Sequence, residues 1–451
     1  MSSTTLALTI EMPPLDASSW EMFESLAVQM SREVPSRVLA EALDEAQERL
    51  IDSVCGPRWA PVRGLAAPFA CPGCGTREDF ARKGRRTRPR KLRTSAGPVE
   101  IILFHVGCRS CGRNFAPLLI MLGLSGKRRT DRLTVDLAEL GTQMSFARAG
   151  RVDDELAGTG ATGGQAHHSL ADVAALLTGS NGTLGPAHSA PDVVLLDGTG
   201  VRAGTSKNGT GANLAIGLTG RTGPVGRRRA RSHLLGLTVG EDWSMLGAQL
   251  VNVPPPVLVV LDGEPAITTL AQRLWPDTPI QRCWWHLPHG LRKAFYADDA
   301  ANRHVNPRWA RDRASELGEL LRDQIRHEHT TDQALAAWDA FTARIPSKLT
   351  SARSYLVIAR PHAFTCLDPA LRTRLAHLGG PELGTGVLER LMRELNARTD
   401  IGGARWSIPG LRDLLTVATA RLLGHPAWHH LKRTTHQPNQ IPFRLQKFNA
   451  T

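Results

Sequence analysis

The sequence predicts a mixed α/β protein. A helical N-terminus and a small cysteine-framed β module precede a larger α/β core, which an all-helical segment interrupts. Residues 15–55 carry apolar side chains at three- and four-residue spacing, which is typical of helices. Two CxxC pairs flank a β-like run from Pro98 to Val106. From about residue 190, continuous apolar runs alternate with helical patterns, which indicates strands buried on both faces of a sheet.

The charge and hydropathy of the chain indicate which kind of molecule it binds. The chain has 451 residues, a formal net charge of +13 and a sequence pI of about 10.0. A balance this basic favours a polyanion, most simply nucleic acid. No apolar run reaches the roughly 18 residues that span a bilayer, and the N-terminus lacks the pattern of a signal peptide. We therefore expect a cytoplasmic, nucleoid-associated protein that has no membrane partner.

The changes of pattern divide the chain into seven segments. They are a helical region (1–62), a cysteine module with a basic hairpin (63–125), a second helical region (126–188), the first part of the α/β core (189–300), a helical insertion (301–375), the last helices of the core (376–435) and a polar tail (436–451). A Gly-rich break at Ala157–Gly164 suggests a helix-turn-helix that binds DNA, although the same helices could instead mediate dimerisation.

The four paired cysteines predict a structural zinc site. Cys71 and Cys74 form one CxxC pair, Cys108 and Cys111 form the other, and 33 residues lie between the pairs. Two closely spaced pairs of thiolates suit tetrahedral Zn²⁺, and the gap fits a β-hairpin between two turns. The alternative is four unpaired buried thiols.

Two basic clusters are candidates for contacts to DNA phosphates. Residues 81–93 contain eight basic residues and no acid: Arg82, Lys83, Arg85, Arg86, Arg88, Arg90, Lys91 and Arg93. Clustered cations release counterions when they bind DNA, but a solvated hairpin would look the same. The second cluster is Arg227, Arg228 and Arg229, with Arg231 next to it.

Two aspartates end apolar runs in the core. Val193–Leu196 leads into Asp197, Val257–Leu261 leads into Asp262, and glycine follows each acid. Strand ends are where α/β sheets place their sites, although a single aspartate there more often caps a turn. Hard Mg²⁺ or Mn²⁺ prefers oxygen ligands, and two such ions catalyse phosphodiester cleavage. Asp197 and Asp262 are therefore the first candidate metal ligands.

A third acid is expected from the helical pattern VLERLMRELNART near the C-terminus. Glu389 and Glu394 are five residues apart in this pattern, so they point to different faces of a helix. Glu389 shares its face with Arg393 and Asn396, and it is the preferred candidate. Glu394 and Glu382 are the alternatives.

Three stretches carry a resemblance to a known family. VVLLDGTG resembles a first-aspartate strand, VLVVLDGEPAI followed by QRCWWH resembles a second strand with a C/DxxH signature, and LERLMRELNARTDIGGARWS resembles a glutamate helix. The spacings agree, with 65 residues from Asp197 to Asp262 and 127 from there to Glu389. Over roughly residues 190–425 the chain resembles DDE transposases of the prokaryotic Mutator-like group and their zinc-ribbon-bearing relatives.

The resemblance implies an RNase H-like core in which Asp197, Asp262 and Glu389 hold Mg²⁺ or Mn²⁺. It implies a transposase of a bacterial insertion sequence, acting as a homo-oligomer on double-stranded DNA. Such an enzyme binds transposon ends, frees a 3′-hydroxyl and joins it to target DNA. Relatives often carry Asn three residues before the glutamate, where this chain has Gly386.

Cys283 and His286 form the CxxH of QRCWWH, and three interpretations are open. Both residues could simply pack at the start of a helix. A metal site would need further ligands, and no partner pair is evident in the sequence. We favour the third, in which His286 supports the active site by holding a catalytic carboxylate or a phosphate oxygen while Cys283 packs.

Two other functions fit the same residues. One is a zinc-ribbon nuclease that cuts DNA without joining it. The other is a domesticated protein, derived from a transposase, that only binds DNA.

Overall fold

The computed structural model of the chain describes residues 19–179, 183–185, 190–201, 210–220, 231–301, 304–327, 329–378, 384, 386–401 and 405–436. The chain forms two compact units, residues 1–173 with 431–451, and residues 174–430. The structure is mixed α/β, as the sequence predicts. Among the helices within these ranges, none combines the length and the apolar character needed to cross a membrane.

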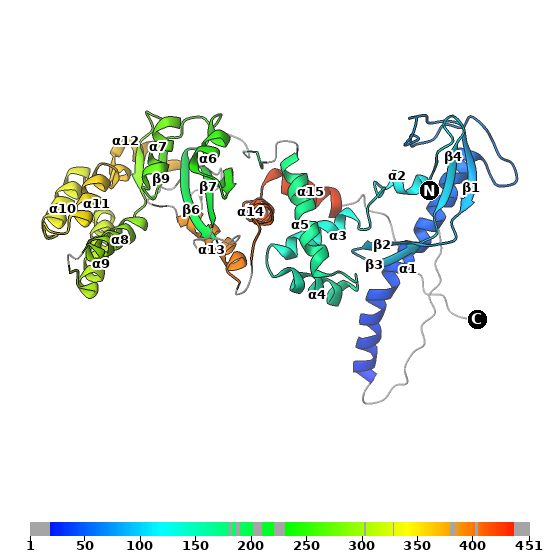
Figure 1. Cartoon of the computed structure of the whole chain (residues 1–451), viewed down its shortest axis with the longest axis horizontal. Coiled ribbons are helices and arrows are strands. Elements are labelled where there is room, and N and C mark those ends of the chain that lie inside the picture. The colour runs from blue at the N-terminus through cyan, green and yellow to red at the C-terminus, as the bar shows by residue number, and fades with distance from the viewer. Residues whose placement is uncertain are drawn as a thin grey trace. The chain divides into compact units, whose positions relative to one another are not determined.

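A long helix and a β-hairpin frame the first unit (Figure 1). Helix α1 runs without interruption over Ser19–Cys55, with Pro35 inside it. The strands are β1 (Phe80–Arg85), β2 (Arg90–Thr94), β3 (Gly97–Ile101), β4 (Phe104–Cys108) and β5 (Asn114–Phe115). β1 pairs with β4 and β2 pairs with β3, both antiparallel, while β5 adds to β4. The hairpin expected between the two cysteine pairs is confirmed.

Helix α1 and the cysteine module share one core. Ile51 and Val54 of α1 pack with Phe80, Val106 and the first cysteine of each pair, Cys71 and Cys108. The Gln47 side chain donates to the Ile102 carbonyl at 2.9 Å and accepts from the Phe104 N–H at 3.1 Å. The Gln47 side chain thereby provides hydrogen-bond partners for two backbone groups at the junction of β3 and β4.

The remaining helices of the first unit are α2 (Pro117–Met121), α3 (Asp131–Gly141) and α4 (Phe146–Ala157). Helix α5 (Gly163–Thr178) belongs to this unit as far as Val173. The Gly-rich break lies between α4 and α5, and α4 ends at Gly158, whose φ is +60°. A Cβ on Gly150 of α4 would lie 2.8 Å from the Gly163 nitrogen. Glycine thus permits the close approach of α4 and α5.

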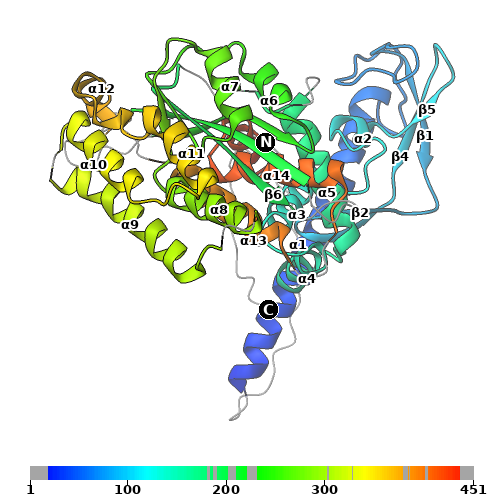
Figure 2. The ribbon, with the colours of Figure 1, turned by 60° about the vertical axis from the view of Figure 1, so that its left-hand side comes forward.

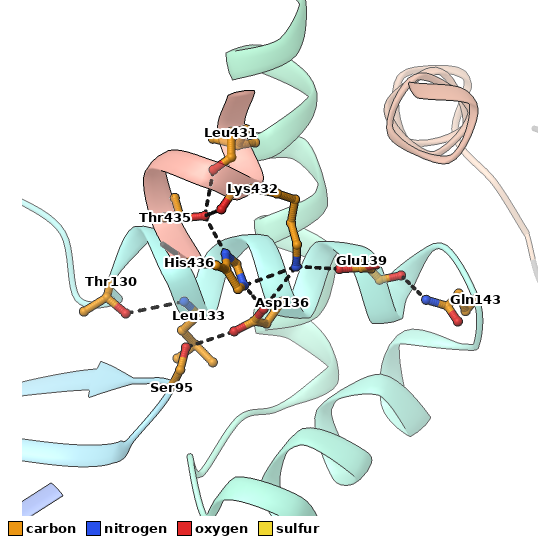
Figure 3. A network of polar contacts seen from close by, with 10 residues as sticks. All are labelled: Ser95, Thr130, Leu133, Asp136, Glu139, Gln143, Leu431, Lys432, Thr435 and His436. Atoms are coloured by element: carbon orange, nitrogen blue, oxygen red, sulfur yellow. Dashed lines mark hydrogen bonds and ion pairs between the residues drawn. The ribbon is translucent and has the colours of Figure 1, made fainter. Parts of the chain in front are cut away.

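The C-terminal end of α15 (Pro426–His436) is tied to α3 by a polar network (Figure 3). Lys432 Nζ donates to Glu139 at 2.8 Å and lies 3.7 Å from Asp136. His436 Nε2 also contacts Asp136, which accepts from the Ser95 hydroxyl at 3.0 Å. The network joins chain segments about 300 residues apart, as the Asp136–His436 contact illustrates.

The second unit is built on a five-stranded mixed sheet in the order β10-β9-β6-β7-β8. The strands are β6 (Val193–Val201), β7 (Thr210–Thr219), β8 (Arg231–Val239), β9 (Leu258–Leu261) and β10 (Ile280–Arg282). β6, β7 and β8 are antiparallel neighbours, whereas β9 runs parallel to β6 and β10 parallel to β9. The central strand β6 therefore has one antiparallel and one parallel neighbour.

Helices cover both faces of this sheet. The helices α6 (Trp243–Leu250) and α7 (Pro265–Leu274) pack on one face, in a core that includes Val194, Leu196, Val259 and Leu261. On the other face, α13 (Gly386–Thr399) contacts β6 and α14 (Ile408–Leu422) contacts β8. Figures 1 and 2 show α7 and α13 on opposite sides of β6.

A helical insertion lies between α8 (His286–Ala300) and α13. It contains α9 (Pro307–Arg326), α10 (Thr331–Ala343), α11 (Thr350–Ala359), α12 (Pro369–Arg374) and the short 3₁₀ turns η2 (Arg360–His362), η3 (Thr365–Leu367) and η4 (Ala376–Leu378). Its core is shared with α8 and includes Phe295, Trp338 and Phe364. No strand occurs among the described residues between α8 and α13, as expected.

Candidate functional site

The two candidate aspartates follow paired residues of adjacent parallel strands. Asp262 comes directly after β9, as expected, but β6 does not end at Asp197: it continues to Val201, because its other edge stays paired with β7. Leu196 of β6 pairs with Leu261 of β9, and Asp197 and Asp262 are the next residues along each chain. Successive side chains of a strand point to opposite faces of the sheet. Leu196 and Leu261 face α6 and α7, so Asp197 and Asp262 face the side on which α13 packs.

Helix α13 brings Glu389 to this same face. Asn396, on the same side of the helix as Glu389, donates its amide to the Thr199 hydroxyl of β6 at 3.1 Å. Thr199 is two residues beyond Asp197 and shares its face. Glu389 is partly buried, whereas Glu394 is exposed on the outside of α13. Glu382 lies outside the described residues.

The charges of the three acids influence one another. Asp197 is 4% exposed. Burial is the main cause that raises its pKa to about 6, and the negative charges of Asp262 and Glu389 add to the effect, while His286 opposes it. The oxygens of the three acids are not gathered as tightly as the atoms of two other groups: among the described residues, the ligand atoms that lie within 4.8 Å of one another are those of the four paired cysteines and those of Cys283, His286 and Glu389. Carboxylate oxygens are the donors that Mg²⁺ or Mn²⁺ prefers. The donor chemistry of the cluster therefore fits such an ion.

Hydrogen bonds hold the two aspartates in place. Asp197 Oδ1 accepts from the N–H of Gly198 at 2.8 Å, and Asp262 Oδ1 accepts from the N–H of Glu264 at 2.8 Å. Asp262 thus also organises the turn into α7, while Glu264 itself is exposed. Asp192 is at the start of β6, where it pairs with His377 at 3.0 Å instead.

Sequence reasoning missed a buried arginine beneath the second aspartate. Arg282 donates to the Gly263 carbonyl at 3.1 Å and to the Tyr355 hydroxyl at 3.3 Å. Gly263 has a φ of +86°, and a Cβ there would lie 1.7 Å from the Arg282 guanidinium carbon. Tyr355 comes from α11, so the insertion supports the turn that carries Asp262. Gly263 could be noted in the sequence as the glycine after Asp262, but nothing in the sequence indicated that Arg282 contacts it.

Cys283 and His286 lie directly against Glu389. Cys283 follows β10, and its N–H donates to the Leu261 carbonyl at 2.8 Å. Its Sγ is 3.7 Å from Glu389 Oε1, and His286 Nδ1 is 3.9 Å from the same oxygen. Burial lowers the pKa of His286, but Cys283 and the carboxylates of Asp197 and Glu389 outweigh it and raise that pKa to about 9. The structure thus places the CxxH beside the carboxylate cluster.

The four paired cysteines converge in the first unit. Cys71 Sγ lies 3.6 Å from Cys111 Sγ, and Cys74 Sγ lies 3.5 Å from Cys108 Sγ. All four sulfur atoms are within 4.8 Å of one another. Thiolates bound tetrahedrally to zinc at about 2.3 Å would lie about 3.8 Å apart. The cluster therefore could bind a structural zinc ion.

Matching turns present these cysteines. The N–H of Gly75 donates to the Cys71 carbonyl and the N–H of Gly112 donates to the Cys108 carbonyl, each at 2.9 Å. Gly75 and Gly112 have φ values of +76° and +72°, a conformation that favours glycine. Burial raises the pKa of Cys71, but hydrogen bonds from the Cys74 and Gly73 N–H groups and from Cys111 outweigh it and lower that pKa. Hydrogen bonds within the same four cysteines raise the pKa of Cys74, so the thiols share their protons unequally.

The basic residues of the hairpin divide into two groups. Arg82 pairs with Asp52 of α1, and Arg85 pairs with Asp44 and Glu48 while stacking 4.5 Å from the Phe104 ring centroid. These pairs attach the hairpin to α1. Lys83, Arg86, Arg88 and Lys91 are exposed, and Lys91 pairs with Glu100 at 2.9 Å.

A basic pocket lies where the hairpin meets the loop before α3. It has a volume of about 470 Å³ and is lined by Arg90, Lys91, Gly126 and Arg128. Arg90 Nη2 donates to the Leu124 carbonyl, while its Nε and Nη1 of nearby Arg93 are buried without a hydrogen-bond partner in the described structure. Arg227, Arg228 and Arg229 lie outside the described residues, and Arg231 is exposed at the start of β8.

Comparison with known proteins assigns no family. The chain matches no protein-family model, and no curated protein matches it.

Proposed function

We propose that this protein is a DDE transposase of a bacterial insertion sequence, with Asp197, Asp262 and Glu389 as the ligands of its catalytic metal ions. The observation that carries the proposal is their placement. One aspartate lies within the central strand and the other directly follows its parallel neighbour, and a helix brings the glutamate to the same face of the sheet. Separate elements that converge on one carboxylate site are what two-metal phosphodiester chemistry requires.

The topology of the second unit supports an RNase H-like core. Its central strand carries the first aspartate, the parallel neighbour carries the second, and the helical insertion interrupts the chain before the glutamate helix. This is the order of parts that the resemblance to Mutator-like transposases implies.

Different residues of the chain would bind the metal ions and the DNA. Bound Mg²⁺ would supply the activation of the attacking oxygen and the stabilisation of the leaving one. Asp197, Asp262 and Glu389 would hold the ions, and His286 would fix the orientation of Glu389 across the 3.9 Å that separates them. The exposed cations Lys83, Arg86 and Arg88 would contact phosphates.

The basic pocket supports a DNA contact in the first unit. The cationic side chains of Arg90, Lys91 and Arg128 line this pocket and would contact phosphate oxygens. The four-cysteine cluster, filled with zinc, would fix the base of the hairpin that carries these residues. We place the protein in the cytoplasm on this proposal, where its DNA substrate would lie.

A strand-transfer assay tests the proposal against its alternatives. DNA from both flanks of the gene, labelled at its 5′ ends, is incubated with target plasmid, Mg²⁺ and the full chain. A transposase produces nicks at the element ends and labelled ends joined to plasmid. Nicks without joined product would support a nuclease, and binding without nicks would support a DNA-binding protein.

A further inference from the structure

Cys283, His286 and Glu389 form a compact cluster of three different ligand types. They come from the end of β10, the first residue of α8 and the first turn of α13. Their sulfur, nitrogen and oxygen atoms all lie within 4.8 Å of one another. Glu389 Oε1 is the shared neighbour, 3.7 Å from the sulfur and 3.9 Å from the imidazole Nδ1.

This donor set differs in kind from the carboxylate cluster. Mg²⁺ prefers oxygen ligands, whereas thiolate and imidazole together select Zn²⁺ and other transition-metal ions. Three protein ligands with one open position are also the usual arrangement of an accessible zinc site. The CxxH alone supplies two ligands, and the fold supplies the third from a residue more than 100 positions away.

The burial of the cluster favours occupancy by an ion. The Cys283 side chain is fully buried, and a Cβ on Gly384 would lie 3.1 Å from its sulfur, so the chain passes close beside it. His286 Nδ1 is buried and has no hydrogen-bond partner of normal geometry among the described residues. A metal ion at this position would give the nitrogen a direct ligand bond in place of its 3.9 Å contact with Glu389.

We propose that Cys283, His286 and Glu389 bind Zn²⁺ or a similar transition-metal ion at a second site, separate from the four-cysteine cluster. Because Glu389 belongs to both ligand sets, this ion draws the carboxylate away from Asp197 and Asp262. Zinc then inhibits the Mg²⁺-dependent reaction. The binding site itself stands on the cluster alone, and only the inhibition rests on the proposed function.

Metal titration of the full chain tests the binding. Protein is first loaded with one equivalent of Zn²⁺, and Co²⁺ is then added as a spectroscopic probe. We expect a second equivalent to bind with a thiolate-to-cobalt charge-transfer band. Cys283→Ser should remove the band and Glu389→Gln should weaken binding, by more than the roughly 10–100-fold that losing an outer partner of a metal site costs.

Cys366→Ser is the matched control, because Cys366 is a fully buried free cysteine of the same unit. It should keep the second equivalent and the band. Circular dichroism confirms that each variant folds, and the partly exposed Glu389 provides a test that does not disturb the buried thiol. Binding of one equivalent only by wild-type protein, or a band that persists in Cys283→Ser, would overturn the site.

Zinc inhibition is measured separately, as each protein's rate with Zn²⁺ divided by its own rate without it. Zn²⁺ should lower the cleavage rate of wild-type protein and of Cys366→Ser at least about tenfold, and that of Cys283→Ser far less. Equal inhibition of all three would refute the competition for Glu389. A protein without any cleavage would refute the proposed function while the cobalt titration still decides the site.

Discussion

Single residues at the candidate site are constrained by near neighbours more than by their own conformational preferences. Gly263 has a positive φ and lies against the Arg282 guanidinium, which is buried and donates to the Gly263 carbonyl. Any side chain at position 263 must displace Arg282 and with it the turn that holds Asp262. The role of Arg282 could not be predicted, because an arginine before a cysteine forms no recognisable pattern.

The first prediction concerns this turn. Gly263→Ala should lower the free energy of unfolding of the second unit by at least about 2 kcal/mol, because a strained φ and an overpacked contact combine. Thermal unfolding followed by circular dichroism measures it. Gly200→Ala is the control, since Gly200 lies on β6 with open space around it and should cost less than about 1 kcal/mol. Equal losses would contradict the contact.

The second prediction concerns His286. His286→Ala should reduce DNA cleavage about 10–100-fold through kcat, with KM for DNA nearly unchanged, because the ring orients Glu389 rather than binding substrate. His289→Ala, an exposed histidine one turn along α8, should have little effect. Wild-type rates in folded His286→Ala protein would leave the histidine with a packing role only.

At the scale of elements, the cysteine cluster closes the base of the hairpin. Phe80 of β1 pairs with Cys108 of β4, so the second cysteine pair begins where the strands end. Without an ion, four thiols confined within 4.8 Å would have to remain in contact by packing alone. The hairpin's attachment to α1 through Arg82 and Arg85 depends on this base.

The third prediction is that the purified chain contains about one zinc ion, bound by this cluster. The Cys108→Ser/Cys111→Ser variant should lose it and should unfold at a lower temperature. Cys55→Ser serves as control, since Cys55 is buried in the same core without joining the cluster. Elemental analysis of dialysed protein gives the stoichiometry, and unchanged zinc in the double variant would disprove the assignment.

A fourth prediction concerns the attachment of α15 to α3 (Figure 3). Lys432→Met removes the donor to Glu139 and the cation next to Asp136. We expect a loss of about 1–2 kcal/mol, seen as roughly 5–30-fold faster hydrogen exchange of the last turn of α15. Arg433→Met, an exposed neighbour, should leave exchange unchanged. Unchanged exchange in Lys432→Met would mean that the His436–Asp136 contact and apolar packing hold the helix without Lys432.

Elements with strong local signals were predictable from sequence. The strands before Asp197 and Asp262 are continuous apolar runs, and the strand-free insertion has helical spacing throughout. The hairpin was indicated by the length of chain between the cysteine pairs. The sharing of one core by α1 and the cysteine module was not, since contacts between distant segments leave no periodic trace in either.

At the scale of the whole molecule, the end of α15 belongs to the first unit. Residues 431–436 are grouped with the described residues that precede position 174, and the sheet unit lies between them in sequence. Dividing the sequence into consecutive segments cannot show that α15 contacts α3, because the two helices are far apart in the chain. The pairing of Lys432 and His436 with acids of α3 appears only in three dimensions.

The candidate site shows the same division between what sequence can and cannot predict. The two aspartates were chosen from strand ends, and the glutamate from helical periodicity and a family resemblance. No spacing predicted that Cys283 and His286 lie against Glu389, or that His286 also influences the charge of Asp197. Residue types and spacing were enough to select the candidate residues. Which of them contact one another depends on how α13 packs on β6.

The most direct test of the central claim is Mg²⁺-dependent cleavage of labelled element-end DNA by matched carboxamide variants. Asp197→Asn, Asp262→Asn and Glu389→Gln should each abolish cleavage while retaining DNA binding, because phosphate contacts elsewhere carry the affinity. Glu394→Gln, on the exposed side of the same helix as Glu389, should cleave at the wild-type rate. Full cleavage by Glu389→Gln together with loss in Glu394→Gln would show that α13 presents a different acid. Full cleavage by both aspartate variants would refute the site.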